Sequence, residues 1–188
     1  MPATTTLPPE CLKTSFVDSM PEPFQGIARE CIPLDTKTLL PASERADLLE
    51  IQLRSQLLKL VQESLEDSDD AALEDVGIFW KGSLELCLHL VYFCDKGKDE
   101  RYKGMSVRKL PLLLLEDALD SLPLPSFQTI WETVVEPSFD ILFANVLWHP
   151  SPKSFPCSLP FIKLCKILKP PGDNTFHKNG KSLKVNYR

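Results

Sequence analysis

The sequence is poor in glycine and in histidine. Seven glycines stand against 17 prolines in 188 residues, and there are three histidines. Glycine supplies the left-handed backbone of tight hairpins and phosphate-binding loops, whereas proline ends helices. Neither a G-x-x-x-x-G-K-[ST] nor a G-x-G-x-x-G loop occurs in the chain. This balance disfavours nucleotide chemistry and favours helices joined by rigid turns.

Long apolar runs are also absent. The longest, residues 110–115, contains a proline and is followed by two acids, whereas a membrane span needs about 20 apolar residues. The first residues show no basic region followed by an apolar stretch, as a secretory signal would. The six cysteines are irregularly spaced and include no C-x-x-C pair, which indicates reduced thiols. We expect an intracellular protein with no membrane span.

The residue types needed for metal binding or nucleophilic catalysis form no convincing set. Cys87, His89 and Cys94 are the best metal candidates, but side chains two apart on one helix diverge, and zinc normally takes four ligands. His89 lies in an apolar segment, His149 in a proline-rich joint and His177 near the end. A satisfied or solvated histidine fits each position better than a catalytic base. We therefore expect no enzyme, no metal, no cofactor and no small-molecule substrate.

Acidic residues cluster on the segment that follows Leu110. Glu116, Asp117 and Asp120 alternate with an apolar stripe that is interpreted as the buried face of a helix. These carboxylates are therefore predicted to lie on its solvated face rather than to form a glycosidase-like pair. For Leu119→Ala, on the apolar stripe, the sequence predicts a loss of roughly 2–5 kcal/mol.

Composition divides the chain into three regions. Residues 1–41 are punctuated by prolines and are predicted to form an extended or loosely attached arm, whose Phe16, Phe24 and Ile32 could still dock on the body. Residues 42–168 carry the helical patterns, and residues 169–188 form a basic tail that we expect to be disordered. From Lys153 onward there are eight basic residues and one acidic residue, against 13 basic and 25 acidic residues before it. The body is therefore acidic and the end of the chain basic.

Two helices are predicted in the first half of the body. Ser43 is a good N-cap for a helix over residues 44–64, whose leucines recur at helical spacing on one face. The acidic stretch 63–75 is predicted to be a linker. The helix that follows, centred on residues 78–94, is apolar nearly all the way round, so other helices must cover it.

The second half continues the same pattern. Residues 95–109 read as a charged, exposed and mobile loop, and residues 110–121 as a helix with Pro111 in its first turn. Ser126 is predicted to cap a fourth helix that ends at Pro137. Further helices could cover residues 138–148 and 159–168, the second with Pro160 in its first turn. The expected fold is all-α, either an irregular helical bundle or an α-solenoid-like array, with disordered termini.

The basic end of the chain is the feature that suggests nucleic acid. Its cations could neutralise phosphates, but no groove-reading or base-stacking module accompanies them. Weak, sequence-independent contact with RNA or DNA is therefore an alternative to a merely solvated terminus. The candidate contacts are Lys163, Lys166, Lys169, Lys178, Lys181, Lys184 and Arg188.

The segment KLPLLLLEDALDSLPLPSFQTIWETVVE, residues 109–136, resembles the N-terminal region of the THO complex subunit 1 family. The likeness lies in a leucine-rich helix that ends in an acidic, proline-bearing turn and is followed by a second helix. With the two preceding helices it covers about residues 46–142, as in a truncated or divergent member. The residues that carry it are Leu115, Asp117, Leu119, Leu122, Pro123 and Leu124, then Ile130, Trp131, Val134 and Glu136.

This resemblance implies a non-catalytic scaffold subunit of the nuclear THO/TREX assembly, which couples transcription elongation to mRNP assembly and mRNA export. Exposed faces of the second to fourth expected helices would pack on the other subunits. Trp80, Phe93, Phe127 and Trp131 are candidate anchors, either in the core or at an interface. The alternatives are a cytoplasmic helical adaptor or trafficking scaffold, and a protein that binds nucleic acid through its tail.

Overall fold

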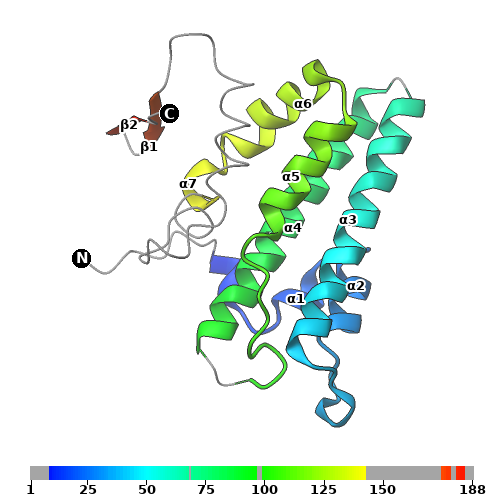
Figure 1. Ribbon diagram of the computed structural model, residues 1–188, viewed down its shortest axis with the longest axis vertical. Helices are drawn as coiled ribbons and strands as arrows, with labels where there is room; N and C mark the ends of the chain where they lie inside the picture. The colour runs from blue at the N-terminus through cyan, green and yellow to red at the C-terminus, as the bar shows by residue number, and fades with distance from the viewer. Residues whose placement is uncertain (1–8, 68, 97–98, 143–174, 179–180, 185–188) are drawn as a thin grey trace.

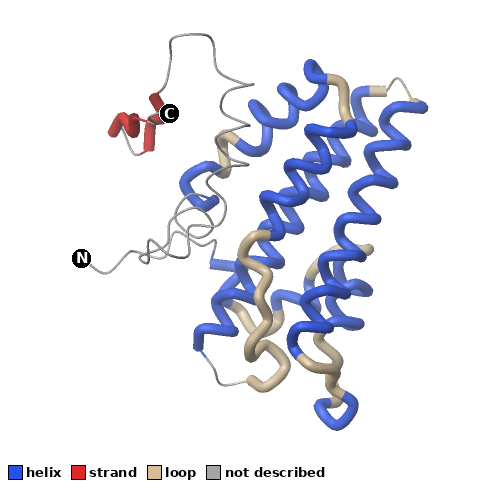
Figure 2. The backbone as a smooth tube through the Cα atoms, in the orientation of Figure 1, coloured by secondary structure: helices blue, strands red, loops and turns tan. Residues whose placement is uncertain are grey.

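The protein, described by a computed structural model, is an all-α bundle, as the sequence predicts. Its three longest helices are α3 (Ala42–Glu66), α4 (Asp70–Lys96) and α5 (Leu110–Ser121), which run side by side in alternating directions (Figure 1). Shorter helices pack around them, and helix dominates the described chain (Figure 2). The structure describes residues 9–67, 69–96, 99–142, 175–178 and 181–184.

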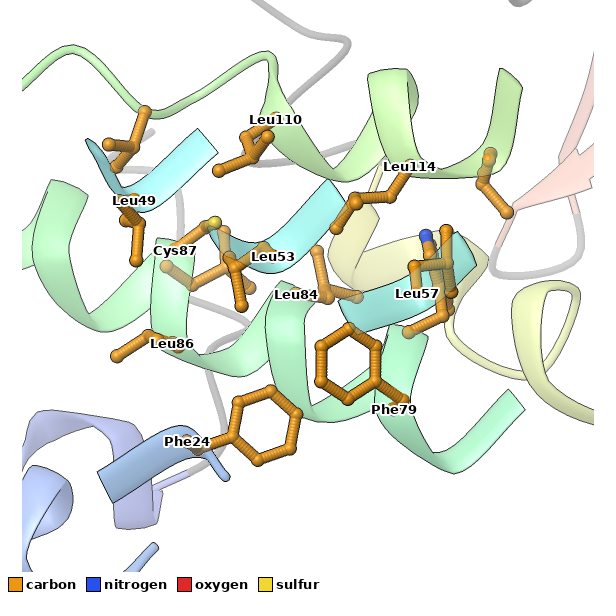
Figure 3. Packing of buried hydrophobic residues seen from close by; sticks show 14 of the residues in the cluster. Phe24, Leu49, Leu53, Leu57, Phe79, Leu84, Leu86, Cys87, Leu110 and Leu114 are labelled. Atoms are coloured by element: carbon orange, nitrogen blue, oxygen red, sulfur yellow. The ribbon is translucent and has the colours of Figure 1, made fainter. Parts of the chain in front are cut away.

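Helix α3 forms for the reason predicted from its leucine spacing. Leu49, Leu53 and Leu57 are fully buried and face α4 and α5 (Figure 3). The predicted cap is wrong: the helix begins at Ala42 with Pro41 at the N-cap position, so Ser43 lies inside the first turn. Proline suits this position because the first turn needs no backbone donor there.

The acidic stretch 63–75 is mostly helical rather than a linker. Helix α3 continues to Glu66 and α4 begins at Asp70, which leaves a joint of three residues. The carboxylate of Asp69 accepts a hydrogen bond from the backbone N–H of Ala71 at 3.1 Å, as an N-cap does. Asp70 stands in the first turn of α4, where the helix dipole favours negative charge.

Helix α4 is the central helix, as its apolar sequence predicts. It contacts α3, α5, α6 and the N-terminal segment, and its leucines on opposite sides are buried. Among described residues it is the one helix with the length and mean hydropathy, 1.2, to cross a membrane, but 61% of that apolar window is buried within the protein. Its composition is therefore explained by the core that surrounds it.

The loop before α5 is docked, not mobile as predicted. Arg45 of α3 is buried and its guanidinium donates to the carbonyl of Leu40 at 2.9 Å and to the carbonyl of Arg101 in the loop. Burial lowers the pKa of Arg45, and the two carbonyls compensate part of the lost hydration. Three loop side chains also enter the core: Tyr102, Met105 and Val107.

Helix α5 has the predicted bounds, Leu110–Ser121, with Pro111 in its first turn. Its buried leucines include Leu112, Leu114 and Leu115, whereas Leu119 is only partly buried. The predicted cost of Leu119→Ala is therefore too high, because a partly exposed leucine leaves a smaller cavity. The full loss of roughly 2–5 kcal/mol is expected instead when the buried Leu114 or Leu115 is replaced by alanine.

The segment after α5 turns sharply and continues as helix. Helix α6 (Leu124–Ile130) has Pro123 at its N-cap, so the predicted cap Ser126 lies within it. It continues as the π-helix η3 (Trp131–Val135) and is followed by α7 (Phe139–Leu142). The expected helix over 138–148 is described only for α7, and the one over 159–168 lies outside the described residues.

The predicted N-terminal arm is packed from residue 9 onward. Its elements are the 3-10 turn η1 (Pro9–Leu12), α1 (Phe16–Ser19), α2 (Phe24–Cys31) and the 3-10 turn η2 (Thr36–Thr38). The segment lies against α3 and α4, and it buries the three residues that were expected to dock, Phe16, Phe24 and Ile32. The N-terminal segment therefore belongs to the same core as the long helices.

Phe24 packs where α4 carries a glycine, and this close approach gives a first prediction. A Cβ on Gly82 would lie 2.5 Å from two ring carbons of Phe24, whose ring stacks on Phe79 at 4.9 Å. Alanine normally stabilises a helix by about 1 kcal/mol relative to glycine. Because the stacked ring has little room to move, we expect Gly82→Ala to destabilise the protein by about 1–3 kcal/mol in urea unfolding.

The control for this prediction is Gly26→Ala on α2. A Cβ there meets only the flexible carboxylate of Glu22, at 3.3 Å. That substitution should leave stability unchanged or raise it. Equal effects of the two alanines would show that Phe24 does not press on α4.

The end of the chain contains a two-stranded hairpin, where the sequence predicts disorder. Strand β1 (Thr175–Lys178) pairs antiparallel with β2 (Lys181–Lys184), with Phe176 opposite Leu183. Asn-Gly stands between the strands in the sequence, at positions 179 and 180, and is the strongest short hairpin signal. The other residues of the predicted tail, 169–188, lie outside the described ones.

Candidate interaction surface

Helix α3 carries apolar residues on its outer side as well as on its core side. Ile51, Leu58 and Leu65 recur every seven residues, which places them in one row along the helix. Their exposed fractions are 62%, 43% and 53%. The core row of α3, from Leu49 to Val61, lies on the opposite side. We call Ile51, Leu58 and Leu65 the outer row; no other described element covers it.

An ion pair joins this helix to α5. Arg54 on α3 donates from Nε and Nη2 to the two carboxylate oxygens of Asp117 on α5, at 2.8 and 2.9 Å, and from Nη1 to Glu50 at 3.0 Å. This two-point pairing raises the pKa of Arg54. Asp117 is only 14% exposed, so its predicted place on a solvated face is wrong. Arg54 follows Ile51 by three residues and precedes Leu58 by four, so this pair joins α3 to α5 beside the outer row.

The four aromatic candidates for anchors lie mainly in the core. Trp80 and Phe127 are almost completely buried, and Trp131 is buried beside Phe127 with their ring centroids 6.5 Å apart. Phe93 is half-buried and packs against His89 and Tyr102. Of the two alternatives, core or interface, burial favours the core for the first three.

The basic candidates are divided between the hairpin and the rest of the tail. Lys178 pairs with Lys181 across the hairpin, and Lys184 stands opposite Thr175 at its other end. The hairpin therefore brings three of the seven cations into one short element. The other four lie outside the described residues: Lys163, Lys166, Lys169 and Arg188.

His89 is buried among aromatic rings and ties the N-terminal segment to α4. Its Nδ1 lies 2.7 Å from the backbone carbonyl oxygen of Cys11, and since that oxygen only accepts, Nδ1 carries the proton. Nε2 has no hydrogen-bond partner among the residues that the structure describes. In a neutral imidazole this leaves only a lone pair unsatisfied, whereas the protonated ring would bury an unpaired N–H and a charge. Burial accordingly lowers the pKa of His89, and the bond to Cys11 only partly opposes this.

This environment gives a prediction for the pH dependence of stability. A histidine whose pKa is lower in the folded state takes up its proton preferentially in the unfolded state. Its contribution is therefore fully present above the unfolded pKa, about 6.5, and is lost as pH falls from there toward the folded value. One such proton can add a slope of at most about 1.4 kcal/mol per pH unit.

Urea unfolding of wild type and His89→Phe between pH 7.5 and 5 measures this slope. We expect the free energy of unfolding to fall more steeply for wild type, because the phenyl ring cannot be protonated. The other two histidines are present in both proteins and cancel. If the free energy of unfolding falls equally with pH in both proteins, protonation of His89 does not cause the pH dependence.

The described residues offer no cluster suited to binding a metal ion. Within residues 9–142 and the hairpin, apart from the gaps, no three His, Cys, Asp or Glu side chains come together to hold a metal ion. Cys87 is enclosed in the core near Leu53 and Leu84 (Figure 3), and burial raises its pKa and so keeps it a thiol. Burial likewise raises the pKa of Cys11 and of Cys31 to about 12. Buried thiols of this kind are inert at neutral pH.

The outer row was missed by sequence reasoning, although its signal is in the sequence. Ile51, Leu58 and Leu65 show a seven-residue spacing out of phase with the buried leucines. The sequence shows that α3 has apolar residues on two sides, but it does not show which of the two sides another helix covers.

Comparison with protein-family models, with curated proteins and with solved structures finds no match for this chain.

Proposed function

We propose that this chain is a non-catalytic helical scaffold that associates with other proteins through the outer row of α3. The observation that carries the proposal is the second apolar side of a long helix. A surface helix of a soluble bundle normally has one apolar stripe and a polar opposite side. Helix α3 buries Leu49, Leu53 and Leu57 in the core. It also exposes three apolar residues on its other side: Ile51, Leu58 and Leu65.

The spacing of the outer row suits another helix. Residues seven apart lie about 10.5 Å apart along a helix axis and stay on one side for several turns. Ser55 and Gln62 stand between the apolar positions, so the seam is narrow and interrupted. A narrow, interrupted seam fits regulated or multi-subunit contacts better than an obligate dimer core.

The assembly we propose is of the THO/TREX type, in the nucleus. Support comes from the resemblance of residues 109–136 to the THO complex subunit 1 family, a segment that forms α5, α6 and η3. In this segment the leucine-rich helix α5 is followed by a turn with Pro123 and by α6, which has Pro125 in its first turn. The role would be to hold subunits together during transcription-coupled mRNP assembly.

The test is affinity capture from nuclear extract with the tagged full chain. We expect wild type to recover THO subunits at mild salt, and Ile51→Glu/Leu58→Glu to lose them while its thermal melt stays close to that of wild type. A matched control is Leu34→Glu/Leu40→Glu, which adds the same two charges at exposed leucines that precede α3 and lie outside the outer row. Failure of wild type to recover any THO subunit would contradict the proposed assembly. Recovery of THO subunits by both the outer-row variant and the control would contradict the proposed role of the outer row.

A further inference from the structure

Two adjoining hollows lie along α4 and share one residue, Ile78. The first, of about 580 Å³, lies between the start of α4 and the α6–η3 segment. The second, of about 480 Å³, lies between α4 and the α1–α2 segment. The residues of α4 that line them form one stripe from Asp70 to Glu85, roughly 22 Å long at 1.5 Å per residue, and the two hollows along this stripe are called the groove below.

The floor and walls of this groove are largely apolar. Ile78 is 58% exposed, while the residues before and after it, Gly77 and Phe79, are buried. Gly77 lets Val134 of η3 approach α4, since a Cβ there would lie 2.8 Å from Cγ2 of that valine. The remaining apolar lining comes from Leu73, Ile130, Phe16, Met20 and Phe24.

The rim at one end is acidic. Asp70 and Glu74 line the first hollow, are exposed, and have no ion pair with any described lysine or arginine. Three more exposed acids stand nearby in the chain: Glu66 at the end of α3, and Asp67 and Asp69 in the joint before α4. At the other end Lys81 and Glu85 offset each other. The groove is therefore neutral at one end and strongly negative at the other.

We propose that this groove binds an amphipathic helix of a partner protein, with apolar side chains over Ile78 and basic side chains against Asp70 and Glu74. The proposal rests on the proposed function as an interaction scaffold and names a second surface and the chemistry of its partner. A helix fits because the groove is about four turns long and its walls are helices, which offer no free backbone edge to an extended strand. Phosphate backbones are excluded because the acidic rim repels them.

Two synthetic 18-residue peptides test the proposal. Both carry the same leucine stripe at helical spacing; one has lysines on its flanks and the other has glutamates. Fluorescence anisotropy with the full chain should show the basic peptide binding at least about tenfold tighter at low salt, with the preference shrinking as salt screens the rim. Equal binding of the two peptides would overturn the proposal.

Variants separate this groove from the rest of the acidic surface. Ile78→Glu should weaken the basic peptide at least about tenfold, and Asp70→Asn/Glu74→Gln should remove the charge preference. The control is Leu34→Glu, at an exposed leucine outside both the groove and the outer row, which should change neither. If Leu34→Glu has the same effect as Ile78→Glu, the binding is a property of net charge and the groove is not the site.

The groove's occupant is also decided by these measurements. If wild type binds no peptide but Lys163→Glu/Lys166→Glu/Lys169→Glu does, the chain's own basic segment fills the groove and the partner proposal is overturned. Peptide binding needs no THO subunit, so its result is independent of the capture experiment. Failure of the scaffold assembly and failure of the groove are therefore distinguishable.

Discussion

Trp80→Ala should cost about 3–5 kcal/mol of stability, the range for a fully buried aromatic side chain. Trp80 lies on α4, is 1% exposed, and its indole N–H donates to the carbonyl oxygen of Pro111 on α5 at 3.0 Å. The alanine removes the indole packing between the two helices and leaves a cavity that rigid neighbours cannot fill. For a protein of this size such a loss lowers the melting temperature by roughly 6–20 °C.

Trp80→Phe separates packing from hydrogen bonding in the same experiment. Phenylalanine keeps most of the apolar volume but has no donor for Pro111, so we expect a smaller loss of about 1–3 kcal/mol. Urea unfolding followed by circular dichroism measures both variants. A loss below about 1 kcal/mol for Trp80→Ala would mean that α4 and α5 do not pack as described.

Helix α5 shows what the sequence is able to predict. Its bounds, Leu110–Ser121, were predicted from leucine periodicity and from the prolines at either end, and both signals are local. The N-terminal segment shows the reverse case. Its helices α1 and α2 are four and eight residues long, too short for a clear periodicity, and they are stabilised by the core that they cover.

The errors at charged positions have a common physical cause. The apolar stripe of α5 predicts that Asp117 lies on the solvated face, but its partner Arg54 lies 63 positions away. The charge of the loop before α5 predicts an exposed, mobile segment, yet Arg45 binds it from another helix. A charge pattern reports local solvation, and it contains no information about a distant partner.

The candidate surfaces were predictable only in part. Ile78 was assigned to an apolar helix that must be covered, and most of that helix is covered. Which residue stays exposed depends on where α1, α2 and α6 end, and those ends are set by tertiary packing. The sequence therefore predicts that α4 is central, whereas the groove beside it is visible only in the structure.

Leu57→Ala and Leu58→Ala should differ sharply although the two leucines are adjacent on α3. Leu57 is fully buried and faces α4 and α5, so its truncation should cost about 2–5 kcal/mol. Leu58 is 43% exposed in the outer row, and its truncation should cost less than about 1 kcal/mol. Both changes replace the same side chain within one helix, so helix propensity cancels and the difference measures burial alone.

The same pair links stability to association. Leu57→Ala should retain partner capture at temperatures where it stays folded, because its side chain does not reach the surface. Leu58→Ala should keep the melting temperature of wild type and yet weaken capture, because the truncation removes part of the outer row. Equal stability losses in urea unfolding would refute the described orientation of α3. Loss of capture by Leu57→Ala alone would mean that the partner recognises the intact core rather than the outer row.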